Sequence, residues 1–342
     1  MADQSAIRST EVPMSNTAGL STGMPAHSPR KFNLASWRAE IGVAVALAVM
    51  IVFFSFNAPN FLTGENWATL LQQTSVIAII AVGMTFVIIT GEIDLSVGAQ
   101  VGLSGTLFAM LVVNYGIPMP IAFLIVLLEA AAVGAFTGLL RVIWGIPTFI
   151  TTLGLLSGLR GIAFYISDGL TIGPLPSSFA NLWYTAFLGL SFPVWVMIVA
   201  ILLGWFVLSQ HRFGQHVYAV GGNPDTAARY GVKVGRLRVG VMVMIQLLAA
   251  ISGVLLVSRL NSGTPTVGEL MELDVIAAVI VGGTILSGGV GRIIGTVIGV
   301  LFVAVLRNGM VLNGLDPVVF LIAQGFVIIL AVWWSMLRKR QA

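Results

Sequence analysis

The stretch LLQQTSVIAIIAVGMTFVIIT, residues 70–90, decides the fold class of this chain. It carries no charge, and it is long enough for a helix that crosses a hydrocarbon core about 30 Å thick, which needs roughly 20 apolar residues. A membrane-spanning β-strand would alternate apolar and polar residues, and this stretch does not alternate. Residues 70–90 therefore predict a transmembrane α-helix.

The same pattern recurs along the chain. Of the 342 residues, 57% are hydrophobic and only 9% are charged, against roughly a quarter charged in a soluble domain. So few charges could not cover a water-soluble fold. Apolar blocks between Gly, Pro and charged residues predict further spans near 41–56, 97–113, 118–140, 148–168, 193–209, 239–257, 275–287, 293–307 and 317–337. We therefore predict an all-α integral membrane protein with about ten transmembrane helices, in a single domain over residues 39–338.

The distribution of charge predicts the topology. Residues 1–38 are rich in Ser, Thr, Pro and Ala, which predicts a disordered tail. Arg30, Lys31 and Arg38 precede the first apolar run, so the positive-inside tendency places this tail in the cytoplasm. Ten spans then return the C-terminus to the cytoplasm and place the basic 210–238 loop there as well. Because the positive charge is explained by topology, we expect no nucleic acid as a partner.

The most unusual segment is Thr90–Gly98, which places the carboxylates of Glu92 and Asp94 between strongly apolar helices. One interpretation is a short cytoplasmic turn whose acids are solvated, with Asp94 or Ser96 capping the next helix. The other is a helix break that faces a solute pathway, because backbone freed at a break needs protein or water around it rather than lipid. The sequence leaves both open.

Glu129 and Arg160 each lie near the middle of a predicted span. A lone charge there costs roughly 2.5–3.5 kcal/mol on insertion scales. Two adjacent antiparallel spans could bring the two side chains together as an ion pair, or each could contact a polar solute. Gln246 is an uncharged polar residue inside another span, where interhelical hydrogen bonding is the usual role. A pathway for a polar solute would use the same residue types.

The longest polar insert between spans, residues 210–238, predicts a short helix on the cytoplasmic face. Asn223 can cap that helix, with Pro224 at its first position, Asp225 in its first turn and Gly231 at its end. A helix of under three turns is marginal by itself, so it should dock against something. The alternative is a basic loop that touches anionic lipid.

Two kinds of site are disfavoured by the sequence. The Gly-rich run Val281–Arg292 lacks the Lys-Ser/Thr ending of a nucleotide-binding loop, so its glycines favour close packing or a break in the bilayer. The histidines, His27, His211 and His216, lie in the tail and in a loop without a ligand cluster, and the chain has no cysteine. We expect neither a bound nucleotide nor a metal site.

Three segments together resemble a known family, the membrane permeases of bacterial ABC sugar importers of the ribose, xylose, galactose and autoinducer type. Thr90–Gly98 is similar to the family's Gly-x-Ile-Asp-Leu-Ser-Val-Gly signature, and the Gly221–Gly231 loop and the Gly282–Arg292 run follow in the same order and spacing. The resemblance covers about residues 40–338. Glu92 departs from the Gly that is most common at its position.

The resemblance implies a subunit of an importer in the bacterial inner membrane, moving a monosaccharide or a similar polyol, and not an enzyme. Its implied partners are a periplasmic sugar-binding protein, a cytoplasmic ATP-binding subunit, a second permease subunit of the same or a different kind, and membrane lipid. ATP and Mg would be bound by the ATP-binding subunit, and this chain would bind no cofactor. Specificity would lie mainly in the sugar-binding protein, because a pathway that held sugar tightly would release it slowly.

The resemblance also assigns roles to residues. The Asn223–Gly231 helix would be the coupling helix that sits in a groove of the ATP-binding subunit. Its contact residues would be Gly222, Asn223, Pro224, Asp225, Ala227, Ala228, Arg229 and Gly231. The candidate pathway or structural polar residues remain Glu92, Asp94, Ser96, Glu129, Arg160 and Gln246.

Two other classes compete with this interpretation. In an ion-coupled secondary transporter, Glu92, Asp94 and Glu129 would be proton or cation sites, and uptake would need no ATPase. An intramembrane enzyme would need a His cluster, or a Ser-His or Asp-Asp arrangement at matching depth, and the sequence offers none.

Overall fold

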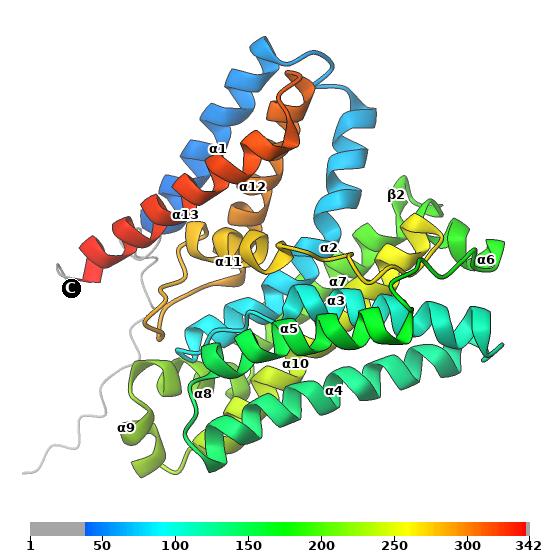
Figure 1. The fold of residues 1–342 in the computed structure, drawn as a ribbon. Helices are drawn as coiled ribbons and strands as arrows, with labels where there is room; N and C mark the ends of the chain where they lie inside the picture. Colours follow the sequence, from blue (N-terminus) through cyan, green and yellow to red (C-terminus); the bar gives the residue numbers. More distant parts are fainter. Residues whose placement is uncertain (1–37, 340–342) are drawn as a thin grey trace, which may run out of the picture. The chain divides into compact units, whose positions relative to one another are not determined.

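The structure is a computed structural model that describes residues 38–339. Among these residues, eight helices are long and apolar enough to cross a membrane (Figure 1). They are α1 (Arg38–Asn57), α2 (Gly64–Ile89), α3 (Val97–Ala109, continued by the π-helical turn η2, Met110–Asn114), α4 (Met119–Ile143), α5 (Thr148–Ile166), α7 (Phe192–Ser209), α10 (Val234–Leu260) and α12 (Ile293–Leu312). The predicted class, an all-α integral membrane protein, is confirmed.

The remaining two predicted spans also lie on helices, and one of them is too short to cross. α13 covers Pro317–Lys339, with an apolar stretch at Val318–Leu330. α11 covers only Met271–Val281, which is about 16 Å of helix. The prediction of a full span at 275–287 is therefore wrong. Helix α11 ends early because Gly282 and Gly283 follow it, and Gly283 adopts a positive φ of 95° that most residues avoid.

Short elements connect the long helices. On one side of the bundle lie α6 (Ser177–Ala180), the 3-10 turn η3 (Asn181–Trp183) and a hairpin of β1 (Ala186–Phe187) and β2 (Leu190–Ser191), paired antiparallel with Ala186 opposite Ser191. On the other side, α8 (Arg212–Gly222) and α9 (Pro224–Arg229) form the 210–238 loop. The predicted tail, residues 1–38, lies outside the described residues except for Arg38, which begins α1.

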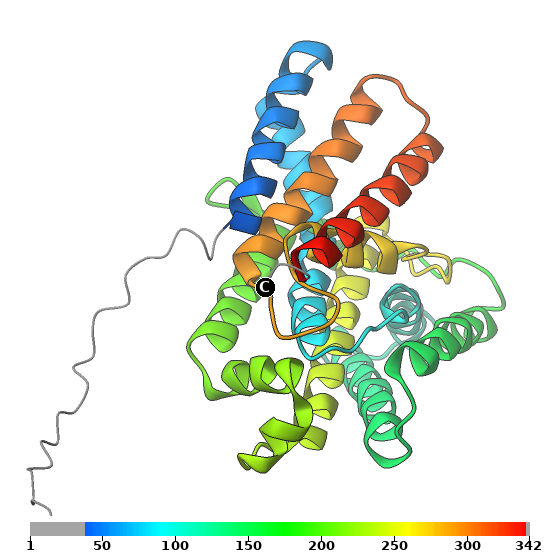
Figure 2. The same cartoon turned by 90° about the vertical axis from the view of Figure 1, so that its left-hand side faces the viewer.

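Helix α2 is the central helix. Within its spanning window 83% of the residues are buried, against 22% in α4 and in α5. It contacts α7, α10, α11 and α12, and Figure 1 shows it passing between α12 and α10. Figure 2 shows α1 and α12 side by side, as their contacts require. Since α4 and α5 leave most of their surface uncovered, these are helices that lipid or another subunit must cover.

Small residues allow the helices to approach closely. A Cβ atom added at Gly134 or Gly138 of α4 would collide with the backbone of α10 near Met242 and Val239. Without a hydrophobic driving force in lipid, such close backbone contact is a main source of helix association. The packing of α4 on α10 therefore depends on glycine spaced four residues apart.

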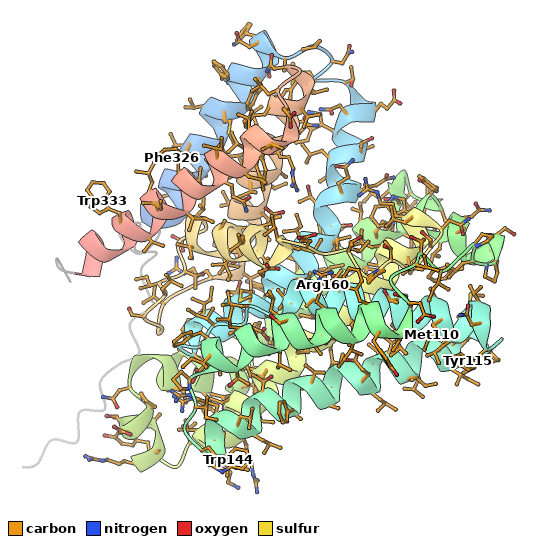
Figure 3. All side chains as sticks on the ribbon, viewed as in Figure 1. Met110, Tyr115, Trp144, Arg160, Phe326 and Trp333 are labelled. Carbon is orange, nitrogen blue, oxygen red and sulfur yellow. The ribbon has the colours of Figure 1, made fainter. Side chains whose placement is uncertain are left out.

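Aromatic rings mark the two ends of α4. Tyr115 precedes the helix and is 68% exposed, and Trp144 follows it and is 67% exposed (Figure 3). Amphipathic rings of this kind favour the headgroup level of a bilayer. Their positions agree with α4 crossing the membrane from one interface to the other.

Candidate functional site

The polar side chains of the segment between α2 and α3, Thr90–Ser96, lie inside the protein. Asp94 and Ser96 are fully buried, and Glu92 is 5% exposed. The interpretation as a turn with solvated acids is therefore wrong, because the segment is covered by α4, α5 and α10. Burial makes every polar group in it need a partner within the protein.

Glu92 joins three helices through its carboxylate. Its Oε1 lies 2.9 Å from Nε of Arg141 on α4 and 2.9 Å from Nε of Arg238 on α10. Thr148 of α5 donates its hydroxyl to Oε2 at 2.9 Å. The Glu92 carboxylate thus links α4, α5 and α10 through two ion pairs and one hydrogen bond. The sequence alone gave no signal that Arg141 and Arg238 are its partners, since both are distant along the chain.

Asp94, Ser96 and Gln246, three of the predicted polar residues, form one buried cluster. Asp94 Oδ1 accepts hydrogen bonds from the Ser96 backbone amide at 2.8 Å and from its hydroxyl at 2.7 Å. Gln246 of α10 donates to Asp94 Oδ2 at 2.7 Å and to the Ser96 hydroxyl oxygen at 2.9 Å. Burial raises the pKa of Asp94 above its ordinary value, while the hydrogen bonds from Ser96 and Gln246 act against that rise.

The cluster also fixes where α3 begins. Ser96 is the N-cap residue of α3, but its side chain accepts no capping hydrogen bond. The Asp94 carboxylate instead accepts from the Ser96 amide in the turn before the helix. Two threonines of α5 accept hydrogen bonds from the neighbouring backbone amides. The Ile93 amide donates to the Thr148 hydroxyl oxygen, and the Leu95 amide donates to the Thr152 hydroxyl oxygen.

Glu129 and Arg160 are not a pair, so the predicted ion pair is wrong. Glu129 accepts a hydrogen bond from Gln100 of α3 at 2.7 Å. Arg160 instead donates to the backbone carbonyls of Pro265 and Val267. Figure 3 shows Arg160 on α5. The pair fails because α3 packs against both helices and its Gly102 lets the Arg160 side chain pass to the segment after α10.

The predicted short helix in the 210–238 loop is confirmed as α9. Asn223 is its N-cap, and the Asn223 side chain accepts a hydrogen bond from the Thr226 amide at 2.9 Å. Pro224 and Asp225 occupy the first turn, and Gly231 follows the helix with a φ of 86°. Ala227 is buried, whereas the other predicted contact residues are exposed or half-buried: Gly222, Asn223, Pro224, Asp225, Ala228, Arg229 and Gly231.

Helix α8 connects α9 to the interior of the bundle. Tyr218 of α8 donates its hydroxyl to the Gly291 carbonyl at 2.7 Å. The Gly289 amide donates to the Ile89 carbonyl at the end of α2, at 2.8 Å. A Cβ atom at Gly221 would overlap that same Ile89 carbonyl oxygen. The Gly-rich run is therefore an irregular segment between α11 and α12, wedged between α8 and the end of α2.

A second group of buried acids escaped the sequence analysis. Asp274 of α11 accepts from Arg307 of α12 at 3.3 Å and from Gln324 of α13 at 2.5 Å. Glu272 is 7% exposed, and its Oε2 has no hydrogen-bond partner among the described residues. The sequence feature that could have revealed these acids is their position at the start of an apolar run.

The described residues form a bundle of membrane-length helices with a buried polar network inside it and a short, largely exposed helix, α9, at one end. The family described as "Branched-chain amino acid transport system / permease component" matches residues 66–332. The chain belongs to this family of membrane permeases. No solved structure matches the chain.

Curated relatives span nearly the whole chain. It is 39% identical over 309 residues to the ribose import permease protein of Escherichia coli strain K12, with 89% of this chain and 96% of that protein covered. It is 40% identical over 305 residues to the ribose import permease protein of Bacillus subtilis strain 168, with 89% and 94% covered. It is 33% identical over 361 residues to the xylose transport system permease protein of Escherichia coli strain K12, with 88% and 92% covered.

These comparisons fix the class of this chain. It is the permease subunit of an ABC importer, a multi-pass protein of the bacterial inner membrane, and not an enzyme. A permease of this class works with an ATP-binding subunit and a substrate-binding protein.

Proposed function

We propose that the chain, together with a second permease subunit, forms the membrane pathway by which a monosaccharide, or a similar small polyol, enters the cell. The observation that carries this proposal is the 39% identity to the ribose import permease protein of Escherichia coli over 96% of that protein. The match to a xylose permease at 33% supports the solute class and leaves the particular sugar open. Selectivity among sugars then rests mainly with the periplasmic binding protein.

Coupling to ATP runs through α9 in this proposal. Apart from the half-buried Pro224 and the buried Ala227, the short helix is exposed, and it carries Asp225 and Arg229 on its surface. Such a helix is marginal alone and gains from docking against a partner, here a groove of the ATP-binding subunit, which also binds ATP and Mg. A partner can shift the permease between two arrangements only through a contact that differs between them.

The path from α9 into the bundle supports this role. Helix α8 touches the Gly-rich run through Tyr218 and Gly221, and the Gly289 amide bonds to Ile89 at the end of α2. A displacement of α9 would therefore reach α2, the central helix, through two backbone contacts. We further propose a second permease subunit, of the same or a different kind, which would cover part of the exposed apolar surface.

The test is reconstitution of the chain with its ATP-binding subunit and binding protein in liposomes. We expect ATP-dependent sugar uptake by the parent assembly, and loss of uptake without loss of membrane insertion in an Asp225→Arg, Arg229→Glu double variant. Glu65→Lys, at the exposed first turn of α2, is the matched control and should leave uptake intact. Uptake driven by an ion gradient without the ATPase would instead establish the secondary transporter. Normal uptake by the double variant would reject the coupling role of α9.

A further inference from the structure

Residues 263–270, which connect α10 to α11, run through the depth of the membrane without forming a helix. This segment lies along α3 in the opposite direction (Figure 1): Gly263 meets Ala109 near one end of α3, and Gly268 meets Gly98 near the other. The distance from Ala109 to Gly98 is about 16 Å of helix. The segment therefore follows α3 through about half the thickness of a 30 Å hydrocarbon core.

Glycines of α3 and an arginine of α5 hold the segment in place. A Cβ atom at Gly102 would lie 2.7 Å from the Val267 carbonyl oxygen, so this glycine lets the segment approach the helix backbone. Arg160 of α5 donates to the carbonyl oxygens of Pro265 and Val267. The segment is thus a fixed part of the structure, and two of its backbone carbonyls are satisfied by a charged side chain.

Other polar groups of the segment have no partner in the protein. Thr266 and Leu270 are exposed, and Gly268 is half-buried. Within residues 38–339, the backbone amides of Thr266, Gly268 and Leu270 donate no hydrogen bond. The hydroxyls of Thr264 and Thr266 lie 3.2 Å apart at the surface. Hydrocarbon offers no partner to such groups, and each one left unsatisfied there costs several kcal/mol. Lipid therefore does not suit this surface.

The neighbouring surface of α5 has the same character. Ser157, the middle residue of α5, is exposed, and its hydroxyl makes no hydrogen bond within the described part of the chain. It precedes Arg160 by three residues, so the two are neighbours on the helix surface. The middle of α4 differs: its exposed residues Leu124 and Leu128 are large and apolar, and they are 56% and 62% exposed. The α4 surface suits lipid, whereas the α5 surface suits water.

We propose that residues 263–270 and the Ser157 side of α5 line a water-filled path between this chain and the second permease subunit. The proposal rests on the importer function above and adds which surface of the chain faces the pathway. Irregular backbone at membrane depth occurs where protein buries it or where it lines a water-filled cavity. Water supplies a partner for each unpaired amide and hydroxyl of this surface, and the second subunit keeps lipid away from it.

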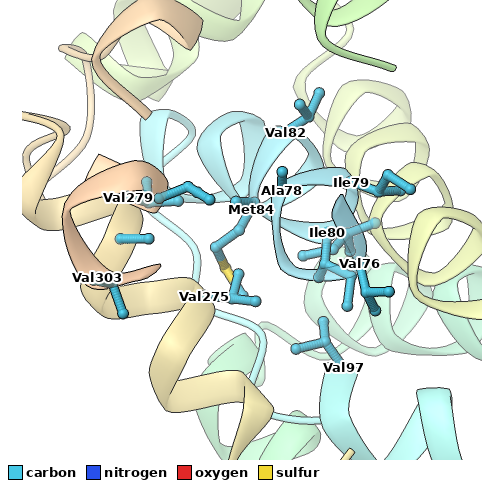
Figure 4. Close-up of a cluster of buried hydrophobic side chains, with 14 of the residues drawn as sticks. Val76, Ala78, Ile79, Ile80, Val82, Met84, Val97, Val275, Val279 and Val303 are labelled. Atoms are coloured by element: carbon cyan, nitrogen blue, oxygen red, sulfur yellow. The ribbon is translucent and has the colours of Figure 1, made fainter. Parts of the chain in front are cut away.

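Hydrogen exchange of the parent assembly in lipid nanodiscs tests for water at this surface. The reference is residues 78–89 of α2, in the buried apolar cluster that holds Ile80 and Met84 (Figure 4). We expect the amides of residues 264–270 to exchange at least about tenfold faster than the reference, because unpaired amides in water are unprotected. Exchange as slow as in the reference would mean a dry surface and would overturn the inference.

A thiol reagent tests the same surface by a second route. The chain has no cysteine, so single-cysteine variants have no background reaction. Thr266→Cys and Leu128→Cys are compared in liposomes, with a membrane-impermeant cationic reagent on both sides of the membrane. The reacting species is the thiolate, which forms in water and not in hydrocarbon. We expect reaction at residue 266 and none at residue 128, and no reaction at residue 266 would overturn the inference.

Uptake decides whether the wet surface is the pathway. Thr266→Cys should take up sugar before modification, and modification should lower ATP-driven uptake by at least about tenfold, because a bulky cation then occupies the path. Modification with unchanged uptake would overturn the inference and leave the importer function intact. Absence of sugar uptake by the parent assembly would instead count against the importer function. The two failures are distinguishable, because exchange and labelling report on water and do not depend on the sugar.

Discussion

Glu92 shows how a single buried carboxylate can hold helices together in a transport protein. It is 5% exposed, and its partners Arg141 and Arg238 are 26% and 18% exposed. Charges in such a place are retained only when they are paired, because the desolvation of an unpaired charge costs several kcal/mol. The two arginines also explain how a carboxylate is tolerated at this buried position: its charge is neutralised locally.

The first prediction concerns the ion pairs of Glu92. Glu92→Gln should lower the free energy of unfolding by about 3 kcal/mol, because two neighbouring guanidinium groups then lose their shared counter-charge. The measurement is thermal or denaturant unfolding of the purified protein in detergent. Glu65→Gln, in the exposed first turn of α2, should change stability by less than about 0.5 kcal/mol. Equal stability of the two variants would show that the ion pairs of Glu92 contribute nothing to the free energy of unfolding.

The second prediction tests which side chains are the partners of Glu129 and Arg160. Because Glu129 bonds to Gln100 and Arg160 bonds to backbone carbonyls, the losses from Glu129→Gln and Arg160→Gln should add within about 0.5 kcal/mol. Glu129→Gln and Gln100→Ala should show a coupling above that value in the same unfolding assay. A large coupling between the changes at 129 and 160 would mean that the two side chains meet in the membrane.

At the scale of elements, α8 links the short exposed helix α9 to the core. It is tied to the Gly-rich run by the Tyr218 hydroxyl, and its Gly221 rests on the last carbonyl of α2. Contacts made by backbone at so short a range cannot stretch or compress much, so α8 and the end of α2 should move together. The glycines keep this contact close.

The third prediction uses two glycines. Gly221→Ala would place a methyl group against the Ile89 carbonyl, whereas a Cβ at Gly64, the exposed first residue of α2, meets nothing within 4 Å. Overpacking of this kind typically costs about 1–3 kcal/mol. We expect Gly221→Ala to reduce ATP-driven uptake strongly and Gly64→Ala to leave it near the parent level. Equal uptake by both variants would show that the contact between α8 and α2 is not needed for coupling.

At the scale of the described molecule, α2 is the element that runs through the core. Its first half lines a cavity of about 540 Å³, its second half is buried, and its last residue, Ile89, contacts the Gly-rich run beside α8. A helix is stiff along its axis, so a displacement that starts at the proposed coupling contact would be carried into the core by a single element. The lateral surfaces of α4 and α5 remain for lipid or a second subunit.

The fourth prediction tests the orientation of the chain in the membrane. With the 210–238 loop in the cytoplasm, Thr226→Cys should react with an impermeant thiol reagent only in inside-out vesicles. Leu188→Cys, in the exposed turn of the β1–β2 hairpin, should react only in right-side-out vesicles. The reverse pattern would invert the topology predicted from the positive-inside tendency.

The sequence by itself determined the helical class, the position of most helices and the short helix α9. These follow from local rules: apolar length sets a membrane helix, and Asn223 with Pro224 sets a helix start. The same rules failed at residues 275–287, because an apolar run does not say whether the glycines after it end the helix within the bilayer. Only the backbone conformation at Gly282 and Gly283 shows that helix α11 ends there.

The tertiary structure alone decided the partners of the buried polar residues and the place of the cavity. Glu92 meets Arg141 and Arg238, Asp94 meets Gln246, and Glu129 and Arg160 do not meet. Helix pairing in a membrane is set by the fit of small residues on facing surfaces, and one sequence does not reveal which surfaces face each other. Membrane-spanning segments are thus readable from local composition, whereas side-chain partners depend on contacts between residues far apart in the chain.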